Sequence, residues 1–474
     1  MPVALALLTL LRLVVAAVTP LAPDEAYYWV WSRALASGYL DHPPMVAGWI
    51  WLGTALLGDG ALGVRLLGPL SGLVGAWLLA ATAGDVCGDR RLGARAALLL
   101  NATLLLGIGT VTMTPDTPLI FFWTLGVFGC GRLLATGDGR WWGLIGLASG
   151  LALDSKYTGV LLPVGVLLWL VWVPGLRPWL RRPQPWLAAA LALALFAPVL
   201  AWNAGHDWVS FAKQGGRTGD WQPGRAAQFL GELLAGQIGL ATPVLAGLFG
   251  LGLWQVAKQG WRREPGGSLL AILAWLPLLV FAQHALGDRV QANWPAILYP
   301  TAALAAAGLG RRWQLPGVAL GLGLTGLVWV QASLAPLALP MRADPTLLRL
   351  GGWEQLAGEI EAVRRAAGAD YVVADNYGHA ALLARLLPGV VLGLDDRWAL
   401  FALPDARAQM VGKVGVLVRS ARRDEAPDLR DWAEVTPLGS RERARNGMVA
   451  EGFRLYRVVG RVGDAPLAVM PHPR

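Results

Sequence analysis

Cysteine is almost absent from this chain, and charged residues are scarce. Its 474 residues include only two cysteines, Cys87 and Cys130. We expect both at the cytoplasmic ends of apolar segments, so a disulfide is not expected and no thiolate metal site is indicated. Charged residues make up 15% of the chain and hydrophobic residues 55%, whereas soluble domains carry about 25% charge. The composition excludes an ordinary soluble protein and predicts a polytopic membrane protein.

A basic patch of the kind that binds nucleic acid is also missing. The formal charge is +9, from 40 Lys and Arg against 31 Asp and Glu. The basic residues stand in short clusters between apolar runs, as in "GDRRLGAR", "RPWLRRP", "KQGWRRE" and "GRRW". Cytoplasmic loops of membrane proteins have this pattern. We therefore predict no nucleic-acid partner and expect the clusters to face anionic membrane lipids.

The first apolar run lacks the basic residues that precede the apolar core of a secretory signal. We expect this run to be retained as the first membrane span, with a cleaved signal as the alternative. Because a span needs about 20 apolar residues, the pattern of apolar runs predicts about eleven transmembrane helices. They are expected near residues 2–21, 62–84, 93–112, 117–135, 141–153, 158–173, 186–202, 236–257, 268–284, 292–309 and 315–338.

The arginine clusters orient these spans. The positive-inside rule is satisfied when the basic loops between them lie in the cytoplasm. The alternate loops and everything after residue 339 then face the outside of the membrane, and these outer segments contain the acids and histidines that follow.

The C-terminal part has no GxGxxG fingerprint, so we assign no nucleotide to it. From about residue 340 the composition becomes that of a soluble domain. A helical period begins near Trp353 and is followed by short strand-like runs. We predict a transmembrane domain over residues 1–339 and an extracytoplasmic α/β domain over residues 340–474.

The stretch "PDEAYYWVWSRALASGYLDHPP", residues 23–44, opens the first outer loop. Its aromatic residues suit a helix in the membrane interface, where Tyr and Trp act as anchors. Asp24 and Glu25 stand in the first turn of this helix. They either cap it and complement its dipole, or one of them works as a general base at the membrane surface.

Asp41 and His42 precede two prolines, which force the chain out of helical conformation. Asp41 suits a turn. His42 is a metal ligand, a cation for a phosphate or an ordinary loop residue, and these alternatives stay open.

Two short outer turns carry charge close to the membrane. Asp116, in "TPDTPLIFFW", stands where an ionisable group is a functional candidate. Lys156, in "LDSKYTGVLLP", either pairs with Asp154 or holds an anionic phosphate as a point charge. Arg12, inside the first span, requires a buried partner or a path to the surface.

The outer loop "NAGHDWVSFAKQGGRTGDWQPG" contains His206, Lys213, Gln214 and Arg217. Polar variety of this kind is typical of a binding loop, with a solvated connector as the alternative. The acids and cations gather on one side of the membrane, which suits an enzyme that joins a lipid-borne anion to an outer acceptor. The alternative is a transporter or flippase of lipid-linked sugars, although such proteins tend to place ionisable groups at mid-membrane.

Five motifs in this order resemble a known family. "PDEAYYWVWSRALASGYLDHPPM", "TPDTPLIFFW", "SKYTGVLLP", "HDWVSFAKQGGR" and "QANWPAILYP" are similar to segments of bacterial relatives of protein O-mannosyltransferases and of the aminoarabinose lipid A transferase. Both belong to the glycosyltransferase C superfamily. The resemblance covers about residues 1–340. It implies the glycosyltransferase C fold, a bacterial inner-membrane location, and transfer of a sugar from a polyprenyl (or dolichyl) phosphate on the periplasmic side.

The resemblance also implies roles for single residues. Asp24 is the expected catalytic base, Glu25 is its neighbour, and Asp116 is the second essential carboxylate. The carrier phosphate or the sugar is expected to contact His42, Lys156, Tyr157, His206 and Arg217.

The aminoarabinose branch has Glu-Lys where this chain has Asp41-His42. In that branch the acid is implicated in metal binding, so Asp41 and His42 are the candidate ligands of a divalent metal here. The expected mechanism is direct displacement at the anomeric carbon. The sugar, the carrier length and the acceptor, whether lipid, glycan or protein, stay open.

Overall fold

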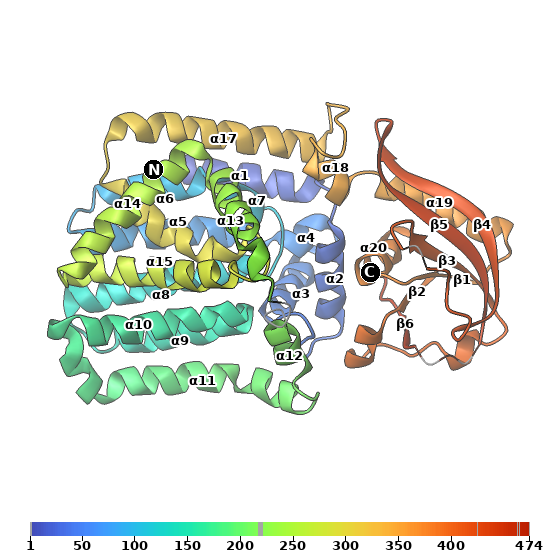
Figure 1. Ribbon diagram of the computed structural model, residues 1–474, viewed down its shortest axis with the longest axis horizontal. Helices are drawn as coiled ribbons and strands as arrows, with labels where there is room; N and C mark the ends of the chain where they lie inside the picture. Colours follow the sequence, from blue (N-terminus) through green and yellow to red (C-terminus); the bar gives the residue numbers. More distant parts are fainter. Residues whose placement is uncertain (1, 217–220, 424, 462, 464, 474) are drawn as a thin grey trace. The chain divides into compact units, whose positions relative to one another are not determined.

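The computed structural model describes residues 2–216, 221–423, 425–461, 463 and 465–473 (Figure 1). The chain divides into two compact units. Unit 1 consists of Met1–Val14, Ser37–Trp49 and Arg65–Leu327, and unit 2 of Val15–Ala36, Ile50–Val64 and Val328–Arg474. Unit 2 therefore includes two N-terminal segments as well as the C-terminal part. The single domain boundary at residue 339 stays a prediction.

Unit 1 is a bundle of apolar helices. Its helices are α5 (Leu67–Cys87), α6 (Leu92–Asn101), α7 (Leu104–Gly109), α8 (Asp116–Thr136), α9 (Trp141–Ser155), α10 (Leu161–Trp172), α11 (Pro183–Ala204), α12 (Val209–Gly216), α13 (Ala226–Ala241), α14 (Pro243–Trp261), α15 (Pro265–His284) and α16 (Leu298–Ala307). Two short 3₁₀ helices precede α10 and α16, namely η1 (Tyr157–Val160) and η4 (Trp294–Ile297). Four further helices run from one unit into the other: α1 (Pro2–Val18), α3 (Met45–Leu57), α4 (Ala61–Arg65) and α17 (Arg311–Ser333).

Among the described residues, five helices are long and apolar enough to cross a membrane, or up to eight if each bent helix pair forms one span. The outer surfaces of these helices are apolar, as lipid requires: α1 exposes Val3, Leu7 and Val14, and α11 exposes Leu187 and Leu193. The chain is a polytopic helical membrane protein. The count of eleven spans stays a prediction.

Three local differences from the predicted spans have physical causes. The span near 93–112 is divided into α6 and α7, because Thr103 caps α7 and accepts a hydrogen bond from the Leu106 amide. The span near 236–257 contains the break between α13 and α14, which meet at a 108° bend just before Pro243. Helix α3 lies in a predicted outer loop, because its 13 apolar residues fall short of the length required of a span.

The helices of unit 1 pack closely where glycine removes the side chain. A Cβ atom added to Gly146 on α9 would lie 2.5 Å from the carbonyl oxygen of Ala188 on α11. Arg12 also finds its partner inside the bundle. It is almost fully buried, and its Nη1 donates to Oδ1 of Asn101 at 2.7 Å. An intramembrane arginine is thereby satisfied in part by an amide on α6.

Unit 2 contains a six-stranded sheet with the strand order β4-β5-β3-β1-β2-β6. Strand β1 pairs in parallel with β2 and β3, whereas the other pairs are antiparallel. The strands are β1 (Tyr371–Ala374), β2 (Val390–Leu394), β3 (Val414–Ser420), β4 (Trp432–Arg445), β5 (Met448–Gly460) and β6 (Leu467–Val469), and the helices are α2 (Pro23–Arg33), α18 (Pro345–Leu350), α19 (Trp353–Ala366) and α20 (Tyr377–Leu386).

Strands β4 and β5 form a long hairpin with a two-residue turn, Asn446-Gly447. Both residues have positive φ, 52° and 75°, as a type I′ turn requires. Each of the first five strands overlaps a strand-like run of the sequence, and β4 and β5 extend beyond theirs. Strand β6 has no such signal because it is only three residues long.

Helix α2 begins at Pro23 and makes an angle of 88° with α1. The sequence pattern indicated that its aromatic residues are lipid anchors, but three of them are buried instead. Tyr27, Trp29 and Trp31 are buried in protein, and Nε1 of Trp29 donates to Oδ1 of Asp59 at 2.8 Å. Periodicity shows which residues share a helix face but not whether lipid or protein covers that face.

Candidate active site

Unit 1 contains a buried polar cluster around Asp116, the first residue of α8. Nζ of Lys156 donates to Oδ1 of Asp116 at 2.7 Å, and Nδ2 of Asn293 donates to Oδ2 of the same carboxylate. Lys156 follows the last residue of α9 and Asn293 precedes η4. Both charged side chains are about nine-tenths buried. One carboxylate thus brings together three segments that are separate in the sequence.

The pairing of Lys156 with Asp154, one of the two sequence alternatives, is wrong. Asp154 lies on the last turn of α9 and is buried, and its Oδ1 makes no hydrogen bond to a described residue. Lys156 leaves the helix with extended backbone angles, which carry its side chain toward α8 and away from its neighbour two residues back.

A second ion pair holds helix α12 against residues 37–49. Nζ of Lys213 lies 2.5 Å from Oδ1 of Asp41, and Nε2 of Gln214 donates to the backbone carbonyl of Asp41 at 2.7 Å. Lys213 and Gln214 lie on α12. This pair is partly exposed, because one third of the Lys213 side chain is accessible. The accessible part of the Lys213 side chain could bind an anion.

The metal role of Asp41 and His42 stays a prediction. In the described part of the chain, no three His, Cys, Asp or Glu side chains gather into a group that could hold a metal ion. The carboxylate of Asp41 is engaged by Lys213 instead. A metal at this corner would need further ligands from the substrate or from water.

Tyr157 and His206 both lie in unit 1 but have different surroundings. Oη of Tyr157 is 2.7 Å from Oγ of Ser210, and its ring packs against Phe211. His206 stacks on Trp202 at 4.2 Å between ring centres, and its Nδ1 is 2.7 Å from the Trp202 carbonyl oxygen. Arg217, the remaining predicted phosphate ligand, lies outside the described residues.

Asp24 and Glu25 belong to unit 2, in the first turn of α2. Glu25 is buried, and its Oε2 accepts a hydrogen bond from the Ala22 amide at 3.0 Å. It therefore completes the N-terminal cap of the helix. Asp24 is different, because 42% of its side chain is accessible. Of the two acids, Asp24 is the one that an acceptor could reach.

Asp24 is held by residues far away in the sequence. Its Oδ2 lies 3.2 Å from Nη1 of Arg349 on α18, and its Oδ1 accepts from the hydroxyl of Tyr377 on α20 at 3.4 Å. Arg349 and Asp24 are both exposed enough for water to weaken their attraction. Their contact orients the carboxylate more than it stabilises the fold.

Helices α2 and α20 also pack directly against each other. A Cβ atom added to Gly378 would lie 2.9 Å from Cβ of Pro23, so glycine is required for this approach. The guanidinium of Arg397 lies 3.8 Å from the ring centre of Tyr377 and 5.3 Å from that of Tyr27. The helix that carries Asp24 is therefore fastened to the β1–β2 crossover helix.

Known proteins resemble this chain in both sequence and structure. Residues 41–202 match the family described as dolichyl-phosphate-mannose-protein mannosyltransferase. The lipid A galacturonosyltransferase RgtD of Rhizobium johnstonii is 28% identical over 433 residues, which cover 86% of this chain and 89% of that protein. The crystal structure of ArnT from Cupriavidus metallidurans bound to undecaprenyl phosphate superposes with a TM-score of 0.62. That likeness covers 96% of this chain and 97% of ArnT at 17% identity. The chain is therefore similar in sequence to sugar transferases and has the fold of ArnT.

These similarities confirm the resemblance inferred from the five motifs. The relatives are named as sugar transferases, which favours a glycosyltransferase over a transporter of lipid-linked sugars. The similarity to RgtD extends over most of both chains, so the C-terminal α/β region is part of what the two proteins share.

Sequence reasoning gave no individual role to four residues that contact the candidate acids, although it placed one of them, Lys213, in a candidate binding loop. Asn293 stands in the motif "QANWPAILYP", and its polar side chain in an otherwise apolar motif is the signal that could have found it. Lys213 stands in the outer loop beside His206. Arg349 and Tyr377 carry no local signal, because only the tertiary structure brings them to α2.

Proposed function

We propose that the chain transfers a sugar from a polyprenyl phosphate carrier to a hydroxyl group of a lipid acceptor. The reaction is assigned to the periplasmic face of the bacterial inner membrane. Support comes from the fold shared with ArnT, from the undecaprenyl phosphate in the ArnT crystal structure, and from the name of RgtD, which acts on lipid A. The observation that carries the proposal most directly is the buried Asp116–Lys156 pair, a charged site on outer turns of a membrane bundle.

Asp24 is assigned the role of general base. It takes the proton from the acceptor hydroxyl while the hydroxyl oxygen attacks the anomeric carbon of the sugar. The bond from that carbon to the phosphate oxygen breaks, and the carrier phosphate leaves with the electron pair. A carboxylate with an accessible oxygen suits this role, and Asp24 is accessible whereas Glu25 is buried.

The leaving phosphate requires cations near it. Lys156 and Lys213 are the two lysines on the outer turns of unit 1, and each is already positioned by an acid, Asp116 and Asp41. Prepositioned charges of this kind stabilise a leaving anion without reorganisation, by several kcal/mol in well-ordered sites. Arg217 and His42 remain further candidates for the phosphate.

The name of RgtD supports galacturonic acid as the first sugar to test and lipid A as the first acceptor. Because the mechanism is a single displacement, the glycosidic bond in the product should have the anomeric configuration opposite to that in the donor. Nuclear magnetic resonance of the product would show the configuration directly.

The decisive experiment uses Asp24→Asn in the purified full-length protein, with undecaprenyl phosphate galacturonic acid as donor and lipid A as acceptor. Transfer should fall by at least about 10²-fold, because the hydroxyl loses its base, while folding and membrane insertion are unchanged. Asp396→Asn, an exposed acid of the same unit, serves as the control. Turnover by Asp24→Asn within a factor of two of the wild type would remove Asp24 from the mechanism.

A further inference from the structure

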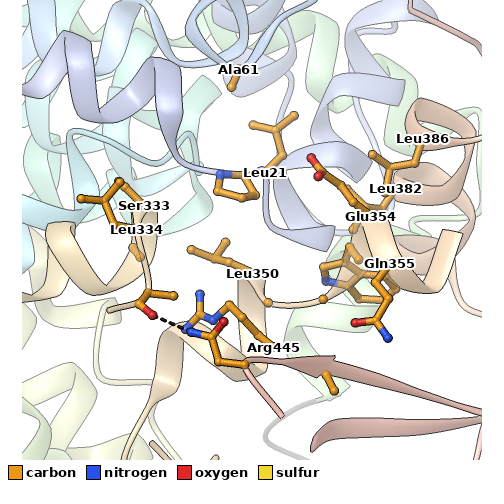
Figure 2. A pocket seen from close by; sticks show the side chains of 18 of the residues that line it. Leu21, Ala61, Ser333, Leu334, Leu350, Glu354, Gln355, Leu382, Leu386 and Arg445 are labelled. Atoms are coloured by element: carbon orange, nitrogen blue, oxygen red, sulfur yellow. Dashed lines mark hydrogen bonds between the residues drawn. The ribbon is translucent and has the colours of Figure 1, made fainter. Parts of the chain in front are cut away.

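Unit 2 contains a cavity that none of the roles above uses. Its volume is about 610 Å³, within the range of small-molecule sites in proteins. Its walls come from the residues after α1, the end of α17, the end of α18 with the start of α19, helix α20, the turn of the β4–β5 hairpin, and Ala61 on α4. Figure 2 shows Leu21, Leu334 and Leu350 around it together with Glu354, Gln355 and Arg445.

The lining of the cavity is amphiphilic. The leucines supply an apolar surface. Glu354 makes no hydrogen bond or ion pair with any described residue, and Figure 2 shows its carboxylate extended toward Leu21. Gln355 uses its Nε2 for Glu359, so its carbonyl oxygen stays available as an acceptor.

Arg445 is fixed at the other end of the cavity. Its Nη2 donates to Oδ2 of Asp344 and to Oγ1 of Thr346, both at 2.8 Å. The neighbouring Asn446 donates to the Ala335 carbonyl at 2.6 Å, which attaches the hairpin turn to the end of α17. A free carboxylate, an amide oxygen and a fixed guanidinium together offer both acceptors and donors, which is what a polyhydroxylated group needs.

The position of the cavity relates it to the membrane. Helices α1 and α17 are apolar, and the cavity lies where both end. An amphiphile with its tail in the lipid would present its headgroup at this depth. The apolar wall suits the base of such a headgroup, and the polar groups suit its hydroxyls.

Three residues that line the cavity belong to the elements that carry or contact Asp24. Leu21 stands three residues before Asp24, and Leu350 follows Arg349, which contacts the Asp24 carboxylate. Leu382 lies on α20, the helix whose first residue, Tyr377, donates to Asp24. A headgroup in the cavity would therefore rest on the three elements that orient the proposed base.

We propose that this cavity binds the sugar headgroup of a glycolipid and thereby serves as the acceptor site. The inference rests on the proposed function, since it names where the acceptor lies. Glu354 and Gln355 accept hydrogen bonds from the headgroup hydroxyls, Arg445 donates to its oxygens, and the leucines contact the proximal acyl region.

The test compares Glu354→Ala and Leu334→Trp with the wild-type protein, using lipid A as the probe and undecaprenyl phosphate galacturonic acid as donor. Glu354→Ala removes the carboxylate from an exposed helical position, and Leu334→Trp narrows the cavity from a side chain that is 75% exposed. Neither substitution alters a residue of the hydrophobic core. Both should raise the KM for lipid A about fivefold or more and leave the KM for the donor within about a factor of two. Glu434→Ala, an exposed glutamate on β4 that does not line the cavity, is the matched control.

Unchanged KM for lipid A in both variants would overturn the acceptor site, and so would an equal rise in the KM for both substrates. A wild-type protein that releases no undecaprenyl phosphate from any lipid-linked sugar would instead refute the proposed function. The cavity is then tested by native mass spectrometry of bound lipid A, which both variants should weaken. Displacement of lipid A by an equimolar amount of phosphatidylethanolamine would identify a phospholipid site and also refute the proposal.

Discussion

Nζ of Lys156 lies 2.7 Å from Oδ1 of Asp116, although 40 residues separate them in the chain. Both side chains are about nine-tenths buried, and Asn293 holds the second oxygen of the carboxylate. A buried charge pair contributes little net stability, but removal of one partner leaves an uncompensated charge. This cluster is therefore a sensitive point for both folding and activity.

Lys156→Met should destabilise the protein by about 3–5 kcal/mol, because Asp116 is left charged and buried. The double variant Lys156→Met/Asp116→Leu should recover much of that stability but no transfer activity. Thermal unfolding in detergent and the transfer assay measure the two effects separately. Arg457→Met breaks the exposed pair of Arg457 with Glu434, in which 58% of the Glu434 side chain is accessible, and should lose no more than about 1 kcal/mol. Recovery of activity in the double variant would show that the pair is only structural.

Gly378→Ala should lower the turnover number without a comparable change in the KM for either substrate. The added Cβ atom would lie 2.9 Å from Cβ of Pro23, so the start of α2 must shift together with Asp24. Gly358→Ala is the matched control, since a Cβ atom there meets nothing within 4 Å and alanine favours the helix. A turnover number equal to that of Gly358→Ala would show that the position of α2 does not limit the reaction.

Lys213→Gln should raise the KM for the lipid-linked donor about tenfold, the value of one charge-assisted hydrogen bond. The lysine is partly exposed and points at Asp41, so it can turn to an incoming phosphate. Its contribution should decline as salt is added, because exposed charges are screened. Lys258→Gln alters a lysine that stacks on Trp254 near a predicted cytoplasmic loop. It should change neither the KM for the donor nor the dependence of that KM on salt. An unaltered donor KM in Lys213→Gln would exclude this lysine from phosphate binding.

Acid should destabilise the α/β unit through His379. Burial lowers the pKa of His379 to about 4, whereas an unfolded histidine titrates near 6.5. Glu451 and Asp375 oppose this shift, and Arg443 and Arg423 add to it. The unfolded state therefore binds more protons between pH 6.5 and pH 4, and stability falls as the pH falls through that window.

The comparison variant is His379→Phe, which places a ring between Trp353 and Phe453, each 5.2–5.9 Å from its neighbour in the native cluster. The drop in unfolding temperature from pH 7 to pH 5 should be smaller in this variant than in the wild type. His472→Phe, at an exposed position near the C-terminus, should keep the wild-type slope. Equal slopes in all three proteins would show that His379 does not govern the acid response.

Much of the architecture was predictable because it depends on short-range patterns. Apolar runs of membrane-spanning length and the placement of arginines predict a membrane bundle, and helical and strand-like runs predict the α/β region. The predicted spans were wrong where an apolar run contains a break between two helices, because hydropathy alone does not show where a helix ends. The run near 93–112 is divided by a threonine cap, and the run near 236–257 contains the sharp bend before Pro243.

The sequence by itself determined that the chain forms a polytopic membrane protein with an additional α/β region, because local hydropathy controls which segments enter lipid. Which acids, histidines and lysines stand on outer turns stays a prediction from the same hydropathy and charge. Only the tertiary structure decided their partners. Lys156 bonds to Asp116 and not to Asp154, and Asp24 meets Arg349 and Tyr377, more than 300 residues away. The reason is physical. Local composition controls whether a segment enters lipid or water, whereas the partner of a charge depends on how separate elements pack against each other.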